Sequence, residues 1–265
     1  MAFLHAATSS HSGPKSGLKS RSYTPYLLLA PGLIWLVTFF IIPIFSLAST
    51  STMVRPEGAQ IGTYVQELRF QNYVDAFVAN QEQYVRSFVY AGIATILALA
   101  IAYPLAYMIA FKSGKYRNIL LGLVVVPFFT SYLIRTLAWN NILADEGPVV
   151  SLINTLHLSG VFESLDIMQN GKLMNTPAAV IGGLTYNFLP FMVLPIYVSL
   201  EKIDVRLVDA AMDLYSSASQ AFRKVVLPLS LPGLFAGSLL VFIPAAGDFV
   251  NAQFLGNPQT TMIGN

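Results

Sequence analysis

The sequence predicts an all-α fold, a polytopic bundle of transmembrane helices. Hydrophobic residues make up 55% of the 265-residue chain and charged residues only 11%, and the mean hydropathy is +0.61. Soluble domains carry about 25% charged residues. The chain also contains five predominantly apolar runs, each near the length of about 20 residues that crosses a hydrocarbon core. Within lipid such a run must form a helix, because its backbone groups find no other hydrogen-bond partners.

Each apolar run is expected to be one span of a single membrane domain, residues 26–265, without a separate soluble domain. In chain order, the predicted spans cover residues 26–48, 87–111, 119–138, 177–200 and 230–250.

The first 25 residues are rich in Ser and Gly and carry basic side chains. We expect residues 1–25 to form a disordered tail. The alternative is a cleaved signal peptide, with Ser-Leu-Ala at 46–48 as the cleavage site. The apolar run that follows the tail has 23 residues, which is longer than the apolar region of a usual signal peptide.

The end of the chain predicts a further span. After the fifth apolar run, Gly-Asn-Pro-Gln-Thr-Thr at 256–261 is typical of a turn-rich external loop. Met-Ile-Gly-Asn at 262–265 then resembles the start of another apolar run. We therefore expect a six-span arrangement of which five spans are present, rather than a five-span protein.

The distribution of Lys and Arg predicts the orientation of the chain. The tail and loop 112–118 hold three each, and loop 201–229 holds four. Loop 49–86 holds three and loop 139–176 only one. Because cytoplasmic loops carry the excess of Lys and Arg, we expect a cytoplasmic N-terminus and a cytoplasmic segment 201–229.

Metal and thiol chemistry have no basis in the sequence. The chain has no Cys, and its three His, His5, His11 and His157, are scattered in segments outside the predicted spans. Thiolate metal sites and Cys nucleophiles are excluded, and no ligand spacing for a metal is present. We predict no catalytic residues and no metal site.

Segment 201–229 is polar and amphipathic, in contrast to the runs on either side. Asp204 is a candidate N-cap of a short helix. Val205, Val208, Met212 and Tyr215 then follow helical spacing and predict one apolar stripe.

A second short helix is predicted directly after the first. Ser217 and Gln220 have the spacing of a capping box, which opens a helix. Leu227-Pro228 is expected to end it. Two interpretations of the helix pair remain open, an amphipathic linker on the membrane surface and a helix pair docked in a groove of a partner.

The same segment resembles the cytoplasmic loop of permease subunits of binding-protein-dependent ABC importers. The family pattern is Glu-Ala-Ala, three residues, Gly, nine residues, an apolar residue, one residue and Leu-Pro. Here Asp209 replaces Glu, Ala210 and Ala211 follow, and Leu227-Pro228 closes the pattern. Tyr215 stands at the Gly position, where Gly would allow a positive φ. The geometry of that turn is therefore expected to differ from the family's.

The resemblance implies a type I ABC importer permease fold and an ATPase partner. The loop would seat in a cleft of the ATPase subunit dimer, which binds ATP and Mg, and it would carry ATP-driven motion to the spans. The chain lacks the GxxxxGK[ST] phosphate loop, so we expect no cofactor in this chain and no enzyme activity of its own. The residues implied in coupling are Val205, Val208, Asp209, Ala210, Ala211, Met212, Tyr215, Phe222, Val225, Leu227 and Pro228.

The resemblance covers most of residues 25–265. Segments 127–143, 187–204 and 241–265 resemble the spermidine/putrescine branch of the family. They imply import of a polyamine through the bacterial plasma membrane, with a second permease subunit, an extracytoplasmic substrate-binding protein and membrane lipid as partners, and no nucleic acid. Related branches that import opines or other small cations share similar sequence, so another small solute is the alternative.

Asp248, near the outer end of the fifth span, is the candidate for binding a cationic amine. A carboxylate at membrane depth is costly and therefore suggests a function, and nearby aromatic rings would add cation–π attraction. The alternative is a hydrated cap at the interface. Tyr132 and Trp139 belong either to the cargo path or to an interfacial aromatic belt.

Asn187, Pro190 and Pro195 predict a break or kink in the fourth span. Asn187 either reaches the cargo path or hydrogen-bonds between helices. Arg135, late in the third span, is expected to have a structural role, because a cationic cargo gains nothing from an Arg. It would extend to the interface or pair with Asp248.

Two other classes are less consistent with the sequence. A secondary transporter or channel would need coupling carboxylates in mid-span and inverted repeats, and neither is evident. A membrane enzyme would need a cluster of catalytic groups, but the predicted spans contain no His.

Overall fold

The computed structural model describes residues 23–56, 58, 60, 62–214 and 217–265. Almost all regular structure in these residues is helical, which confirms the predicted fold class. The chain divides into two compact units, Met1–Phe77 and Val78–Asn265.

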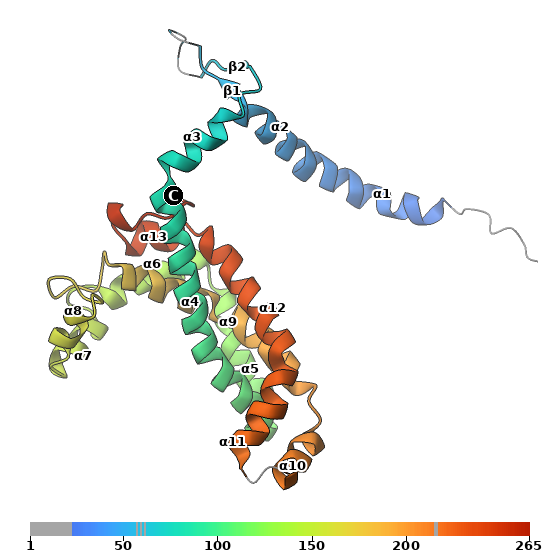
Figure 1. Ribbon diagram of the computed structural model, residues 1–265, viewed down its shortest axis with the longest axis vertical. Coiled ribbons are helices and arrows are strands. Elements are labelled where there is room, and N and C mark those ends of the chain that lie inside the picture. Colours follow the sequence, from blue (N-terminus) through green and yellow to red (C-terminus); the bar gives the residue numbers. More distant parts are fainter. Residues whose placement is uncertain (1–22, 57, 59, 61, 215–216) are drawn as a thin grey trace, which may run out of the picture. The chain divides into compact units, whose positions relative to one another are not determined.

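The first unit contains a long apolar helix followed by a small hairpin (Figure 1). Helix α1 (Thr24–Leu36), the π-helical turn η1 (Val37–Ile41) and α2 (Ile42–Ser51) follow one another without a break, and 25–51 is long and apolar enough to span a membrane. None of its most apolar window is buried in the protein. Strands β1 (Met53–Val54) and β2 (Val65–Gln66) pair antiparallel, and α3 (Gln71–Ala79) follows.

Three long helices form the core of the second unit: α4 (Gln81–Tyr107), α9 (Pro177–Glu201) and α12 (Leu227–Ala246) (Figure 1). Small residues permit their close approach. A stripe on α4 is completely buried, and it consists of Ala91, Ala94, Ala98, Ala102 and Ala106.

The contact between α9 and α12 is equally tight. A Cβ atom added at Gly233 of α12 would lie 2.4 Å from the Cβ of Ser199 and 2.5 Å from the carbonyl oxygen of Pro195. At Gly237 it would lie 2.9 Å from the sulfur of Met192. The absence of a side chain at Gly233 is therefore a packing requirement.

The fourth span is unbroken. Of the predicted break or kink, the break is wrong, because helix α9 runs for 25 residues through Pro190 and Pro195. Neighbouring helices and local adjustment can satisfy the carbonyl groups that a proline leaves free in a membrane helix. Helix α4 is likewise extended by the π-helical turn η2 (Met108–Lys112).

The predicted third span, 119–138, is broken. After the 3₁₀ turn η3 (Gly114–Tyr116), the chain forms α5 (Arg117–Val125) and the 3₁₀ turn η4 (Val126–Phe129). It then bends by 95° before α6 (Tyr132–Leu143). Pro127 opens η4, and Thr130 and Ser131 are extended, with ψ of 147° and 137°. An apolar run does not reveal such a bend, because both halves have the composition of one helix.

The fifth span starts earlier than predicted. Helix α11 (Ala218–Ala221), the π-helical turn η5 (Phe222–Val226) and α12 form one apolar helix, 218–246. The prediction that Leu227-Pro228 ends a separate short helix is therefore wrong. Pro228 lies two residues after the last residue of the π-helical turn, Val226, and widened turns of this kind adjust the hydrogen bonding around a proline.

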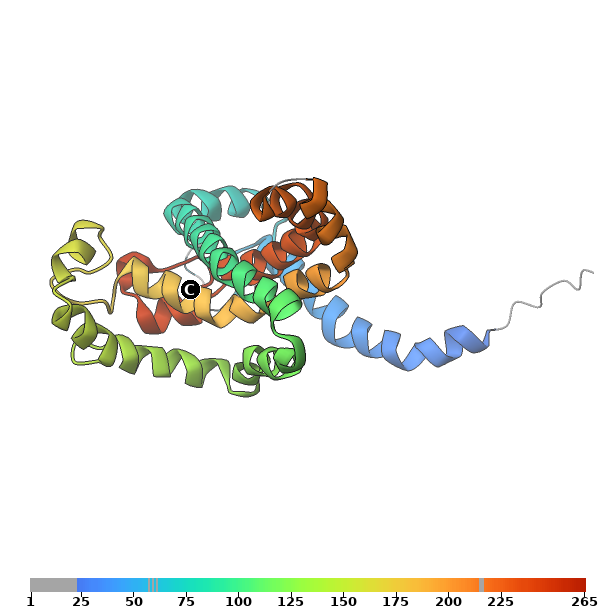
Figure 2. The same ribbon diagram turned by 90° about the horizontal axis from the view of Figure 1, so that it is seen from below.

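Shorter helices lie at the two ends of the packed helices (Figure 1). Helix α10 (Val205–Leu214) is at one end, called here the α10 end; α13 (Val250–Leu255) and the 3₁₀ turn η6 (Pro258–Thr260) are at the other, called the α13 end. Helices α7 (Pro148–Thr155) and α8 (Ser159–Ser164) lie beyond α6, away from the three core helices (Figure 2).

Within the described residues, four helices are long and apolar enough to cross a membrane. The bent pair built on α5 and α6 makes five if it counts as one span.

Candidate functional site

A buried carboxylate lies at the α13 end, where α12 stops. Asp248 is only 7% exposed. Its Oδ2 accepts a hydrogen bond from the Tyr132 hydroxyl at 2.5 Å. Its Oδ1 accepts one from the Asn251 backbone N–H at 2.7 Å and one from the Asn251 side-chain amide at 3.1 Å. All these donors are neutral.

The polar network continues across the helices. The Asn251 amide also donates to the Tyr132 hydroxyl at 2.6 Å, and the Asn251 Oδ1 accepts from Asn187 Nδ2 at 3.1 Å. Asn187 Nδ2 lies 3.3 Å from the Thr136 hydroxyl. The Asn187 Oδ1 is buried and has no hydrogen-bond partner in the described part of the chain. Buried polar atoms are rarely left in this state, so this acceptor requires an explanation.

Three separate segments build this network. Tyr132 and Thr136 lie one turn apart on α6, and Asn187 lies in the middle of α9. Asp248 and Asn251 lie at the corner between α12 and α13, where the bond from the Asn251 N–H satisfies a donor of the first turn of α13. Helix α6 begins at Tyr132, just after the bend, and the hydroxyl of Tyr132 contacts Asp248.

The structure thus brings together three of the sequence-predicted site residues, Tyr132, Asn187 and Asp248. It adds Thr136 and Asn251, which the sequence analysis missed. The spacing of three between Asp248 and Asn251 was a usable signal, since residues three apart are neighbours on a helix. No feature of the sequence marked Thr136 as a site residue.

Trp139, the fourth residue predicted for the cargo path, packs against an aromatic ring of α9. Its ring contacts Tyr186 in a T-shaped arrangement, with ring centroids 5.3 Å apart.

Arg135 contacts aromatic rings, and no ion pair joins it to Asp248 in the described residues. The guanidinium lies 5.4 Å from the ring centroid of Phe128 and 5.7 Å from that of Tyr132. Its Nε and Nη1 are buried without a hydrogen-bond partner in the described residues. The predicted pairing with Asp248 is therefore wrong for this conformation.

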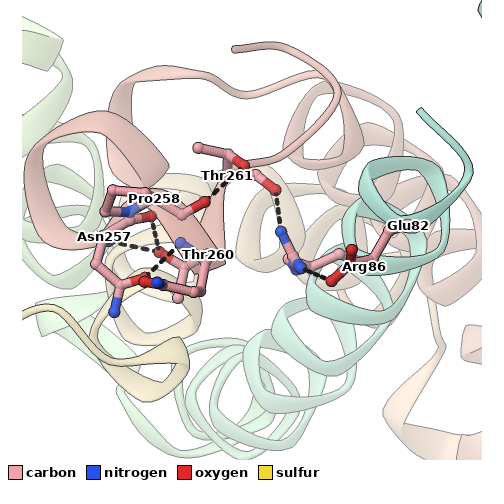
Figure 3. Close-up of polar contacts among 7 residues, drawn as sticks. Glu82, Arg86, Asn257, Pro258, Thr260 and Thr261 are labelled. Carbon is pink, nitrogen blue, oxygen red and sulfur yellow. Dashed lines mark hydrogen bonds and ion pairs between the residues drawn. The ribbon is translucent and has the colours of Figure 1, made fainter. Parts of the chain in front are cut away.

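The segment after α13 holds the Asp248 corner in place. Asn257 and Thr260 form a reciprocal capping box around η6 (Figure 3). Arg86 of α4 donates to the Thr261 carbonyl at 2.9 Å and pairs with Glu82 (Figure 3). The segment predicted to be an external loop is thus packed on α4.

Two further bonds extend this attachment. The Ile263 N–H donates to the buried Ser87 hydroxyl at 2.8 Å, and the Asn265 amide donates to the Phe249 carbonyl at 3.1 Å. A Cβ atom at Gly264 would lie 2.4 Å from the carbonyl oxygen of Gly247. Residues 261–265 therefore cover the backbone on either side of Asp248.

The predicted N-cap residues of the amphipathic segment, Asp204 and Ser217, each accept a backbone hydrogen bond. Asp204 accepts a hydrogen bond from the Arg206 N–H at 3.0 Å at the start of α10. Ser217 accepts one from the Gln220 N–H at 3.3 Å at the start of α11.

The predicted apolar stripe of α10 is only partly covered by the protein. Val208 packs on the core and Ala211 is buried, whereas Val205 is 55% and Met212 43% exposed. Leu207 is exposed as well. The stripe keeps its helical spacing along α10, and the protein covers it at Val208 but leaves Val205 and Met212 exposed. Tyr215 lies outside the described residues.

The other residues implied in coupling occupy three kinds of environment. Asp209, Ala210 and Pro228 are exposed. Val225 and Leu227 are half-buried, and the neighbouring Val226 is buried. Phe222 packs edge-on against Tyr103 and Tyr107 of α4, with centroids 5.8 Å and 5.9 Å away. Phe222 thus anchors its helix to α4.

No cluster of three or more metal-ligating His, Cys, Asp or Glu side chains occurs in the described residues.

Comparison with known proteins relates the chain to one class of transporter component. The family described as "Binding-protein-dependent transport system inner membrane component" matches residues 102–265. The spermidine/putrescine transport system permease protein PotB of Haemophilus influenzae is 40% identical over 232 residues, which are 87% of this chain and 77% of that protein. PotB of Escherichia coli is 36% identical over 231 residues, 87% of this chain and 80% of that protein.

A solved structure supports the fold assignment. A bacterial ABC transporter involved in the import of the acidic polysaccharide alginate has a chain that matches with a TM-score of 0.54 and 18% identity, covering 91% of this chain and 79% of that chain. This likeness shows the type I ABC importer permease fold. The resemblance predicted from the sequence is confirmed, and the chain belongs to the family of inner membrane components of binding-protein-dependent transport systems.

Proposed function

We propose that this chain forms part of the membrane path of an importer for a polyamine such as spermidine or putrescine. The PotB relatives supply the substrate class. The observation that carries the proposal is the buried carboxylate of Asp248, whose donors among the described residues are all neutral. In the same network, the buried acceptor Asn187 Oδ1 has no hydrogen-bond partner in the part of the chain that the structure describes. An ammonium group complements both, because it is positively charged and has only N–H donors.

Burial of a carboxylate costs free energy unless it is paired with a positive group. A primary amine at Asp248 would supply that charge, and its remaining N–H groups would be available to Asn187 Oδ1. The Tyr132 ring would add cation–π attraction. Each end of a polyamine carries such an ammonium.

For coupling, we propose that α10 docks on a separate ATPase subunit dimer that binds ATP and Mg. Val205 and Met212 lie exposed on one face of this helix, with Asp209 nearby, and Leu207 is exposed on another face. An amphipathic helix of this kind binds in an apolar groove. A second permease subunit and an extracytoplasmic binding protein would complete the importer, with α10 and the N-terminus on the cytoplasmic side.

Asp248→Asn tests the cargo proposal in vesicles that contain all subunits. We expect uptake of labelled spermidine or putrescine to fall about tenfold or more, because hydrogen bonds to charged groups contribute about 1.5–3 kcal/mol. Asp248→Glu keeps the charge and should retain part of the uptake. Asp145→Asn, which removes an exposed carboxylate, is the matched control and should transport normally. Unchanged uptake in Asp248→Asn would remove this residue from the path.

The second candidate is an importer of opines or related solutes. Arg135 favours it, since its buried Nε and Nη1 have no hydrogen-bond partner in the described residues and suit a carboxylate. An opine carries both positive and carboxylate groups. Competition distinguishes the two: an opine that displaces spermidine in the wild type but not in Arg135→Gln supports the second candidate, and failure to compete supports the first.

A further inference from the structure

A cluster of three side chains at the α10 end joins two helices that are far apart in sequence. Arg117 is the first residue of α5, and Glu201 is the last residue of α9. Their side chains form an ion pair. The Arg117 Nε also donates to the hydroxyl of Tyr197, whose ring lies 5.0 Å from the guanidinium carbon. Tyr197 is buried in the core.

Both charges are unfavourably placed on their own helices. The N-terminus of a helix favours anions and the C-terminus favours cations. Arg117 is a cation near the N-terminus of the helix that η3 and α5 form together, and Glu201 is an anion at the C-terminus of α9. Their pairing offsets both unfavourable terms, so the cross-helix contact accounts for two placements that helix stability alone does not explain.

The cluster lies between the two regions that the proposed function must connect. Only 202–204 separates Glu201 from α10, and Asp204 caps that helix. On the other side, α5 leads through η4 and the 95° bend to Tyr132, which contacts Asp248.

We propose that Arg117, Tyr197 and Glu201 are positioning residues that make the start of the broken span move with the corner between α9 and α10. This inference rests on the proposed function, in which α10 receives motion from an ATPase. Ion pairs that connect packed elements can carry the energetic coupling between two sites. Without the cluster, α10 would still bind the ATPase, but its motion would reach α5 and the bend less completely.

Charge reversal tests the role of the cluster. Arg117→Glu, Glu201→Arg and the double variant are reconstituted with the other subunits, and ATP hydrolysis and polyamine uptake are measured on the same vesicles. We expect each single variant to raise the ATP consumed per amine by about tenfold, within the range usual for coupling between sites. The double variant should return this ratio to within about threefold of the wild type, because it restores the pair and places both charges favourably on their helices.

Two controls separate coupling from assembly. Exchange of the exposed pair Lys172 and Asp145, whose charged atoms are 2.5 Å apart, should leave the ratio unchanged. If a reversal prevents assembly, Arg117→Gln provides a milder change, with a smaller rise in the ratio expected.

The result that overturns the inference is an assembled single variant with the wild-type ratio, or a double variant as uncoupled as the singles. A wild-type complex with uptake independent of the ATPase overturns the proposed function and the inference together. Normal coupling in both the wild type and Arg117→Gln overturns the inference but leaves the proposed function intact.

Discussion

Asp248 follows Gly247 at the end of an apolar helix, and its neighbours decide what it can do. The sequence did not decide whether Asp248 is a hydrated cap at the interface or a ligand for the cargo. The structure buries the side chain and surrounds it with Tyr132 and Asn251. The side chain is therefore buried, and it caps the first turn of α13 through the Asn251 N–H while its carboxylate faces the polar network.

Asn251→Leu tests how much the Asn251 side chain contributes to the stability of the polar network. The substitution removes the side-chain donor to Asp248 but keeps the backbone N–H bond. Because Asn251 is buried and also serves Tyr132 and Asn187, we expect a loss of about 1–3 kcal/mol in stability. Thermal unfolding in detergent measures this loss. Gln253→Leu, at an exposed position of the same helix, is the control, and equal unfolding temperatures would argue against the network.

Gly233 shows how one missing side chain sets the distance between α9 and α12. Gly233→Val would place atoms within 2.4 Å of Ser199 and 2.5 Å of the Pro195 carbonyl. Overpacking of this kind costs about 1–3 kcal/mol, and the affected contact includes backbone that cannot rotate away. Thermal stability in detergent should fall accordingly.

Gly92 on α4 is the matched control, because a Cβ atom there meets nothing within 4 Å. Gly92→Ala should be neutral or slightly stabilising, since Ala is the better helix former. Similar losses at both positions would point to a general intolerance of substitution rather than to the α9–α12 contact.

At the scale of elements, α10 illustrates a limit of periodicity. The spacing of its apolar residues correctly indicated an amphipathic helix. It could not indicate which apolar positions the protein itself covers, because that depends on residues from other elements. Val208 and Ala211 face the protein, and Val205, Leu207 and Met212 remain exposed.

Met212→Cys tests the exposed side of α10 in this Cys-free chain. With a thiol-reactive cross-linker, we expect capture of an ATPase subunit from the assembled complex. Ala211→Cys is the adjacent control, and it should react poorly because Ala211 is buried. Capture through residue 211 but not 212 would contradict the proposed docking side.

At the scale of the whole second unit, the last residues of the chain connect distant segments. Arg86 and Ser87 at the start of α4 hold Thr261 and Ile263, more than 170 positions later. The same segment covers the backbone around Asp248. Attachment at α4 therefore contributes to the geometry of the buried carboxylate.

Arg86→Ala should loosen this attachment. We expect faster amide hydrogen exchange at Met262 and Ile263, because the anchoring bond to the Thr261 carbonyl is lost. Exchange measured by mass spectrometry checks this, with Arg69→Ala as the control for loss of an exposed ion pair. Unchanged exchange at 261–263 would show that Ser87 alone suffices.

The sequence by itself determined the features that depend on local composition and spacing. Apolar length gave the membrane class, and the short-range spacing of Asp204, Ser217 and Gln220 gave two helix starts. The motif around Asp209–Ala211 gave the family. These features follow from contacts within a few residues, which a single sequence contains.

Only the tertiary structure decided how these elements combine. It placed the 95° bend before Tyr132, continued one helix through Pro228 and α9 through its two prolines, and covered part of the surface of α10. It also joined Tyr132 to Asp248 and Arg117 to Glu201. Each outcome depends on packing between segments far apart in the chain, and local apolar composition is the same whether or not that packing occurs.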